Sequence, residues 1–119
     1  MIKKILIIDD EEIVRRALKR AFEKFEFQVE LAENGYIGLN KWRDFQPDII
    51  LLDLIMPVMS GTELLNELAN KQHCPIVVMS AFTAGVEISN LKQLGATSFI
   101  AKPFENIFNV VSEVEALIK

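Results

Sequence analysis

The sequence contains only one cysteine, one histidine, four prolines and five glycines. A single cysteine excludes an internal disulfide. Cys74 follows His73, but the chain holds no further Cys or His to complete a metal site, so we interpret this segment as a loop before a strand. Half of the residues are hydrophobic, and with so little Pro and Gly this excludes a disordered or low-complexity chain.

Long hydrophobic runs are missing as well. No run reaches the roughly 20 residues that a membrane span needs. Met1 is followed by two lysines and a short apolar run that ends in acids, which is not the pattern of a signal peptide. We therefore expect a cytoplasmic protein that does not bind a membrane.

The chain has few positive charges relative to its acids. It contains 13 Lys and Arg residues and 17 Asp and Glu residues, which gives a net charge of -4. This balance argues against a nucleic-acid surface within this chain. The basic run Arg15–Arg20 is interleaved with hydrophobic residues, so we interpret it as the solvated face of an amphipathic helix.

The length of 119 residues predicts one domain, residues 1–119, with a sizeable core. Short β-rich runs alternate with segments of helical periodicity. The expected strands are Lys4–Ile8, Gln28–Glu33, Asp48–Leu54, Pro75–Ala81 and Thr97–Lys102. The first, third and fourth are almost continuously apolar, as in strands covered on both faces, whereas the second and fifth are more mixed and are expected nearer an edge.

Hydrophobic residues at helical spacing predict five helices between and after the strands. In chain order they are marked by Ile13, Val14, Ala17, Leu18, Ala21, Phe22 and Phe25; by Tyr36, Leu39 and Trp42; by Leu64, Leu65 and Leu68; by Ile88, Leu91 and Leu94; and by Ile107, Val110, Val111, Val114 and Ile118. Ser60–Glu63 fits a capping box at the start of the third helix. Gly95 stands where the end of a helix favours a left-handed residue.

Strictly alternating strands and helices predict a parallel sheet with right-handed crossovers and helices on both faces. Five such units are too few to close an eight-stranded barrel. The sequence therefore predicts an α/β fold with a doubly wound, five-stranded parallel sheet.

The segment Leu6–Glu12, LIIDDEE, sets an apolar run directly against four consecutive acids. Neighbouring carboxylates repel each other, and burial makes their ionisation harder. Two interpretations stay open for the segment alone. The acids form a solvated turn and the start of a helix, where they favour the helix dipole, or they hold a cation.

Chemically useful side chains stand at the carboxyl ends of four of the five expected strands, where open α/β sheets bind their ligands. They are Asp9, Asp10, Asp53, Ser80 and Lys102. Three carboxylates at one edge suit Mg²⁺, which takes carboxylates together with phosphate oxygens and water. Lysine and hydroxyl groups suit phosphoryl oxygens, and a carboxylate can itself accept a phosphoryl group. Asp53 is the best candidate acceptor, because the central strand carries it alone.

Each of these residues also has an ordinary structural explanation. Asp53 alone would serve as a turn former at a strand end, and Lys102 before Pro103 would serve as a solvated strand end. Each structural explanation is sufficient for its own residue. Taken together they are weak, because they need several independent coincidences on one edge of the sheet.

Four motifs in this order and spacing resemble the receiver domain of two-component response regulators. They are ILIIDDEE (residues 5–12), PDIILLDLIMPVMSG (47–61), VVMSA (77–81) and FIAKPF (99–104), and the resemblance covers the whole chain. It implies a flavodoxin-like (βα)5 fold with strand order 2-1-3-4-5.

The resemblance also implies roles for individual residues. Asp53 accepts the phosphoryl group and contributes to a Mg²⁺ site with Asp10, the backbone carbonyl of Ile55 and, through water, Asp9. Ser80 and Lys102 contact the phosphoryl oxygens. Ser80 and Phe99 form the switch, and the Lys102–Pro103 peptide bond is expected to be cis.

Three departures from the family pattern change these expectations. Phe99 lacks the hydroxyl of the tyrosine that many relatives carry, so a switch here works by packing alone. Ser80 stands where threonine is commoner and has no β-branch to restrict its rotamer. Ser60 replaces a common aspartate.

Two positions flank the approach of water to the phosphorus in this family, and here they hold Ile55 and Phe82. Neither side chain can orient a water molecule, so slow self-dephosphorylation is expected. The alternative is that Phe82 points to solvent as part of a partner-binding face.

The resulting hypothesis is a phosphorylation-activated switch rather than an enzyme with a separate turnover substrate. A sensor histidine kinase or phosphotransfer protein donates to Asp53. The response reaches a downstream partner or a fused output domain through the face built from the fourth helix, fifth strand and fifth helix. A phosphorylation-dependent dimer is a further option.

A metal-dependent phosphohydrolase with an aspartyl nucleophile is the alternative. It would need a carboxylate at Ile55 and a substrate-capping insertion. A nucleotide-binding module is disfavoured, because no Gly-rich phosphate-binding motif is present.

Overall fold

The computed structural model describes residues 2–54, 56, 61–69, 74–80, 92–93 and 95–118. Five parallel strands form one sheet in the order β2-β1-β3-β4-β5. The strands are β1 (Lys4–Ile8), β2 (Gln28–Ala32), β3 (Ile49–Asp53), β4 (Ile76–Ser80) and β5 (Ser98–Ala101). Both the predicted parallel sheet and its order are confirmed, with strand bounds within two residues of the expected ones.

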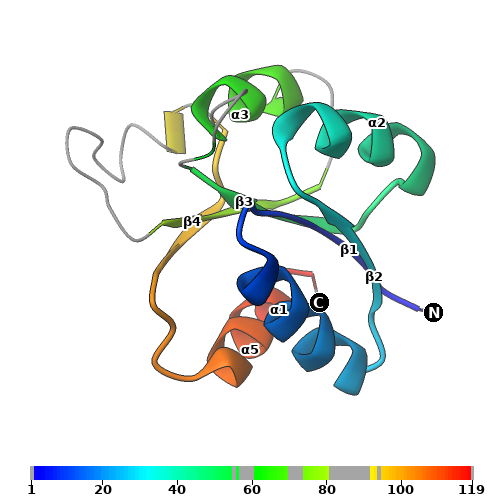
Figure 1. Cartoon of the computed structure of the whole chain (residues 1–119), viewed down its shortest axis with the longest axis vertical. Helices are drawn as coiled ribbons and strands as arrows, with labels where there is room; N and C mark the ends of the chain where they lie inside the picture. The colour runs from blue at the N-terminus through cyan, green and yellow to red at the C-terminus, as the bar shows by residue number, and fades with distance from the viewer. Residues whose placement is uncertain are drawn as a thin grey trace.

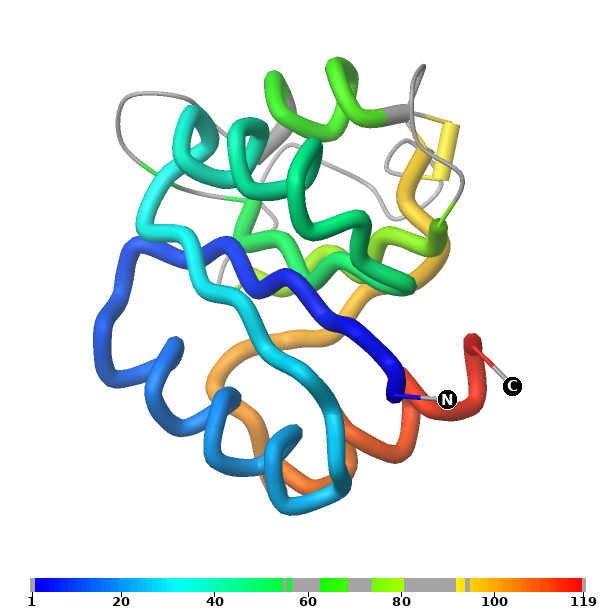
Figure 2. The backbone as a smooth tube through the Cα atoms, turned by 90° about the vertical axis from the view of Figure 1, so that its right-hand side faces the viewer, coloured from blue at the N-terminus to red at the C-terminus, as the bar shows by residue number. Residues whose placement is uncertain are grey.

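The helices in the described part of the chain cover both faces of the sheet. They are α1 (Glu12–Lys24), α2 (Gly35–Phe45), α3 (Gly61–Ala69) and α5 (Ile107–Leu117). Figure 1 shows α2 and α3 on one face and α1 and α5 on the other. Figure 2 shows α1 and α5 side by side beneath the sheet.

Alternate residues of each central strand feed two separate hydrophobic cores. Leu6 and Ile8 of β1 face the core beneath α2 and α3, whereas Ile5 and Ile7 face the core shared with α1 and α5. Every residue of β3 and β4 is buried, while the edge strands β2 and β5 are mostly half-buried. This difference confirms the distinction that the sequence predicted between apolar central strands and mixed edge strands.

The first helix buries fewer of its hydrophobic residues than the sequence predicted. Leu18, Ala21 and Phe22 are buried, but Ile13 is 83% exposed and Phe25 is 45% exposed. Ala17 is exposed too. Ile13 and Ala17 lie one step, about 100°, around the helix from Val14 and Leu18, so they fall outside the stripe that faces the sheet.

Two predictions about the backbone can be checked, whereas other expected features fall on residues that the structure does not describe. Gly95 has a φ of 114°, and the Lys102–Pro103 bond is cis, both as expected. Lys92 and Gln93 are helical, and the rest of the fourth helix expected around Ile88–Leu94 lies outside the described residues, as do the Ser60 end of the capping box, Ile55 and Phe82. Within the described part of the chain, no helix combines the length and hydrophobicity that a membrane crossing requires.

Gly38 marks the closest approach of α2 to the sheet. A Cβ at this position would lie 2.7 Å from Cδ1 and 3.1 Å from Cγ1 of Ile8, which is fully buried in β1. Gly38→Ala should therefore destabilise the fold by about 1–2 kcal/mol, because overpacking outweighs the roughly 1 kcal/mol that alanine gains in a helix. Urea unfolding measures this difference.

Ile8→Val removes Cδ1 and supplies the matched background for Gly38→Ala. In that background the added methyl should cost close to nothing. An equal penalty in both backgrounds would show that the Ile8 contact is not the cause.

Candidate functional site

The carboxyl ends of the strands bring the predicted residues to one edge of the sheet. Asp53 ends β3 and Ser80 ends β4, while Asp9 and Lys102 directly follow β1 and β5. Backbone hydrogen bonds continue past the strand ends, since Asp9 N–H donates to Ala32 O and Lys102 N–H donates to Ser80 O, each at 3.0 Å. Functional side chains from distant parts of the sequence are thus fixed by the sheet itself.

Four carboxylates gather at this edge. One oxygen from each of Asp9, Asp10, Glu11 and Asp53 lies within 4.8 Å of the others. Asp9 is fully buried and Asp53 is 4% exposed, whereas Asp10 and Glu11 are exposed. The cluster therefore has a buried base and an open side, which suits an ion or phosphate approaching from solvent.

Lys102 is the cation at the centre of these acids. Its Nζ lies 2.6 Å from Asp9 Oδ2, 3.2 Å from Glu11 Oε1 and 3.5 Å from Asp53 Oδ2. Burial alone would lower the pKa of Lys102, but the contacts with Asp9, Asp53 and Glu11 together outweigh it and raise the pKa above 10.5. Lys102 is therefore a fixed positive charge at neutral pH.

Asp9 has a structural role as well as a place in the cluster. Its Oδ1 accepts a hydrogen bond from Glu11 N–H at 2.9 Å, and Arg15 Nη1 donates to its carbonyl oxygen at 2.8 Å. Among the described residues, Asp9 Oδ2 has the ion pair with Lys102 but no hydrogen bond of good geometry. The acids after β1 thus shape the turn before α1, and Asp9 also holds the Lys102 ammonium at the strand ends.

Two further candidates in the described part of the chain, Ser80 and Phe99, lie in strands of the sheet. Ser80 is buried at the end of β4. Phe99, in β5, is half-buried and packs against the core beneath α2 and α3. This packing is compatible with a switch that acts through side-chain repacking.

Sequence reasoning missed two residues that shape this site. The sequence singles out no individual role for Glu11, and it places Arg15 on a solvated helix face. Arg15 is half-buried and donates to Asp9 instead. Glutamate is not among the residues preferred at an N-cap, but the sequence does not show that Glu11 takes that position.

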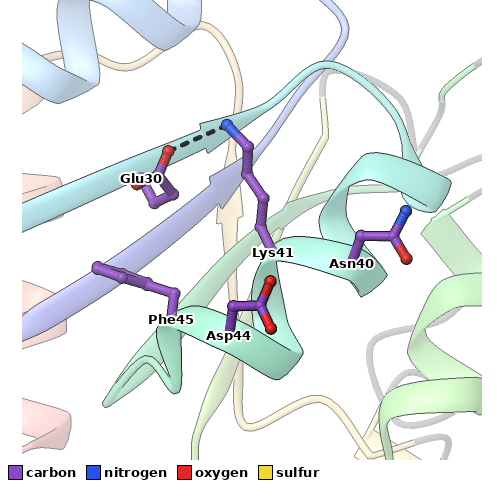
Figure 3. A pocket seen from close by; sticks show the side chains of 5 residues that line it. All are labelled: Glu30, Asn40, Lys41, Asp44 and Phe45. Carbon is purple, nitrogen blue, oxygen red and sulfur yellow. Dashed lines mark hydrogen bonds and ion pairs between the residues drawn. The ribbon is translucent and has the colours of Figure 1, made fainter.

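A shallow groove lies away from this edge, between β2 and α2. It is lined by Glu30, Asn40, Lys41, Asp44 and Phe45 (Figure 3). Lys41 pairs with Glu30 at 3.0 Å and also donates to Leu31 O on the open edge of β2. The cluster of four carboxylates lies at the strand ends and not in this groove, so the strand ends remain the better candidate site.

Cys74 is half-buried and has the chemistry of an unreactive thiol. Burial, followed by the charge of Asp48, raises the pKa of Cys74 from 9.0 to about 11. A two-unit shift leaves about 100-fold less thiolate at pH 8, and the thiolate is the nucleophile. We expect alkylation by iodoacetamide, followed by mass spectrometry, to accelerate with a midpoint near pH 11 in the native protein.

The urea-unfolded protein is the control for this measurement, and its alkylation should show a midpoint near pH 9. The folded state keeps the Cys74 thiol neutral up to a higher pH than the unfolded state does. The free energy of unfolding should therefore fall as the pH rises from about 9 to 11. A native midpoint near 9 would mean that burial does not govern this thiol.

Comparisons with known proteins agree with this geometry. Residues 5–112 match the family model of the response regulator receiver domain. The chain is 35% identical over 105 residues to regulatory protein AtoC of Escherichia coli, covering 87% of this chain and 23% of AtoC. It is also 35% identical over 118 residues to transcriptional regulatory protein ResD of Bacillus subtilis, covering 98% of this chain and 48% of ResD.

Solved structures show the same architecture. Chemotaxis protein CheY4 of Vibrio cholerae superposes with a TM-score of 0.90 at 26% identity, over 98% of this chain and 99% of that one. The chain spans less than half the length of the two curated relatives above. The phosphohydrolase alternative is not favoured by any of these matches. The chain belongs to the receiver domains of two-component response regulators, which act as phosphorylation-activated switches.

Proposed function

We propose that Asp53 is the phosphoryl acceptor of this receiver domain. The observation that carries the proposal is the setting of its carboxylate, which is 4% exposed at the end of the central strand and 3.5 Å from the Lys102 ammonium. In the reaction an oxygen of Asp53 forms a bond to phosphorus, and the P–N bond of a donor phosphohistidine breaks. Incubation with acetyl phosphate and MgCl₂ should add one phosphoryl group to the intact mass.

The residues of the site fit a magnesium ion. Receiver domains bind Mg²⁺ at their acidic pocket, and here the donor set is a group of carboxylates within 4.8 Å of one another, of which Asp10 and Glu11 are exposed to solvent. Asp10 and Asp53 would hold the ion directly and Asp9 through water. The Ile55 carbonyl, which lies outside the described residues, is proposed as a further ligand. When bound, Mg²⁺ supplies positive charge to the phosphoryl oxygens.

The chain's own residues supply the remaining chemistry. The ammonium of Lys102, fixed by Asp9, is placed to neutralise charge on the phosphoryl oxygens, and the Ser80 hydroxyl is proposed to donate to one of them. Movement of Ser80 toward the phosphoryl group would leave room for Phe99 to repack. This is the proposed link from chemistry to the surface of β5 and α5.

The proposed partners follow from the family. Receiver domains of response regulators interact with histidine kinases and with output domains. For this chain we propose a sensor kinase or phosphotransfer protein as donor, and a downstream protein or fused domain as output. No separate turnover substrate is proposed. Self-dephosphorylation that is slow because Ile55 and Phe82 cannot orient a water molecule stays a prediction.

Mg²⁺ affinity should depend on Asp10 more than on Asp9. Asp10 is exposed and open to direct ligation, whereas Asp9 is already engaged by Lys102 and Glu11. Loss of a direct ligand should cost more than loss of a water-mediated contact, which is typically worth roughly 10- to 100-fold. Calorimetric titration with MgCl₂ should show that Asp10→Ala binds Mg²⁺ more weakly than Asp9→Ala does.

Circular dichroism must accompany that comparison, because Asp9→Ala leaves Lys102 without its closest partner. Asp44→Ala, an exposed change on α2, is the control and should bind like the parent. The reverse order of the two variants, in folded protein, would contradict the assignment of Asp10.

A further inference from the structure

Glu11 occupies the N-cap of α1 without capping the helix. Its side chain makes no capping hydrogen bond, and N-cap positions favour shorter side chains such as Ser, Thr, Asp and Asn. Glu11 instead reaches Lys102, 91 positions along the chain, with Oε1 3.2 Å from Nζ. Its carboxylate therefore serves a tertiary contact and not the local helix.

Lys102 divides its charge among three carboxylates of unequal exposure. The side chains of Asp9 and Asp53 are 0% and 6% exposed, whereas that of Glu11 is 61% exposed. An ion pair in solvent is the weaker one, because water competes for both charges. The Glu11 contact is therefore the one that Lys102 can most easily give up.

We propose that Glu11 is a positioning residue that draws the Lys102 ammonium partly away from Asp53 and releases it when a phosphoryl group arrives. The inference rests on the proposed acceptance of phosphate by Asp53. A phosphoryl dianion on Asp53 places new negative oxygens beside Lys102, and the ammonium follows them. Glu11 then loses its partner, so its attraction for Lys102 opposes the phosphorylated state.

Before phosphorylation the same carboxylate has the opposite effect on metal binding. Glu11 adds negative charge to the acidic cluster and shares the charge of Lys102, so less of that positive charge opposes a cation beside Asp53. Removal of the Glu11 charge should therefore weaken Mg²⁺ binding and strengthen phosphoryl binding. A variant that is merely damaged would weaken both.

Glu11→Gln tests this inference, because it removes the charge and keeps the size. The probes are MgCl₂ by calorimetry, and beryllofluoride, a phosphoryl analogue, at saturating Mg²⁺. We expect the Kd for beryllofluoride to fall and the Kd for MgCl₂ to rise, each roughly two- to five-fold, the range of an exposed ion pair. Glu12→Gln is the matched control, since Glu12 is exposed and pairs with Arg16 rather than with Lys102. It should leave both constants unchanged.

The same change in a Lys102→Met background asks whether Glu11 acts through Lys102. There the effect of Glu11→Gln on beryllofluoride binding should largely disappear. An undiminished gain in that background would mean direct repulsion and would overturn the proposed role. Equal constants for Glu11→Gln and Glu12→Gln in the Lys102 protein would overturn it as well.

Failure of this inference is distinguishable from failure of the proposed function. A parent protein that neither binds beryllofluoride nor takes up phosphate refutes Asp53 as an acceptor, and the Glu11 proposal falls with it. A parent that does both, with no difference between the two glutamine variants, refutes Glu11 alone.

Discussion

Replacing Asp53 by asparagine should abolish phosphoryl uptake from acetyl phosphate, within the detection limit of intact-mass spectrometry. Asparagine keeps the shape of the side chain but has no nucleophilic carboxylate oxygen. Asp9 cannot substitute, because it is fully buried and 2.6 Å from Lys102. Asp10 and Glu11 are exposed and lack the fixed position that a strand end gives Asp53. Chelation of Mg²⁺ should have the same effect on the parent protein.

Asp44→Asn is the control, because it removes one exposed aspartate from α2 and leaves the strand ends intact. It should become phosphorylated like the parent. The Asp53→Asn variant should also remain folded, since it removes one of four clustered carboxylates around a single lysine. Labelling of folded Asp53→Asn at the parental level would mean that another residue accepts the phosphoryl group.

Lys102→Met should destabilise the metal-free protein by about 3 kcal/mol, near the lower end of the cost of breaking a buried ion pair. The variant leaves Asp9 fully buried without its ion-pair partner and removes the positive charge that contacts three of the four clustered carboxylates. Added Mg²⁺ should restore much of the loss, because a cation that binds only the folded state stabilises it by mass action. Urea unfolding with EDTA and with MgCl₂ measures both effects.

Lys41→Met is the matched control for this experiment. Lys41 also has an ion pair, with Glu30 at 3.0 Å, but both side chains are more than a third exposed, so the loss should stay below about 1 kcal/mol. The raised pKa of Lys102 also gives a pH dependence. The stabilisation that charged Lys102 gives to the fold is present at neutral pH and disappears as the pH rises above 10.5. At such pH values the free energies of unfolding of the parent and of Lys102→Met should therefore become more alike. Equal stability of Lys102→Met and parent in EDTA would show that Lys102 does not neutralise the cluster.

The arrangement of the sheet was predictable from the sequence because each central strand carries a strong signal. β3 and β4 are covered on both faces, and their sequences are apolar up to the last residue of each strand. Such runs predict strands in the centre of a parallel sheet. The strand-end residues followed from topology, since parallel strands share one carboxyl edge. Asp9, Asp53 and Lys102 therefore meet as predicted, although 93 positions separate the first from the last.

The details that failed depend on geometry that a one-dimensional pattern does not contain. Ile13 belongs to the hydrophobic set of α1, yet only the packing angle of the helix decides that it faces solvent. The sequence treats Glu11 only as one of four acids that either form a solvated turn or hold a cation, and its contact with Lys102 depends on the path of the chain after β5. Long-range side-chain partners of this kind are set by the folded structure.

Borohydride trapping tests the central claim most directly. The reagent reduces an aspartyl phosphate to homoserine, which permanently marks the acceptor for peptide mass spectrometry. After treatment with acetyl phosphate and MgCl₂, homoserine should replace aspartate at Asp53 and at no other acidic residue. Homoserine at Asp9 or Asp10, or its absence from the whole chain despite a phosphoryl mass gain, would contradict the account.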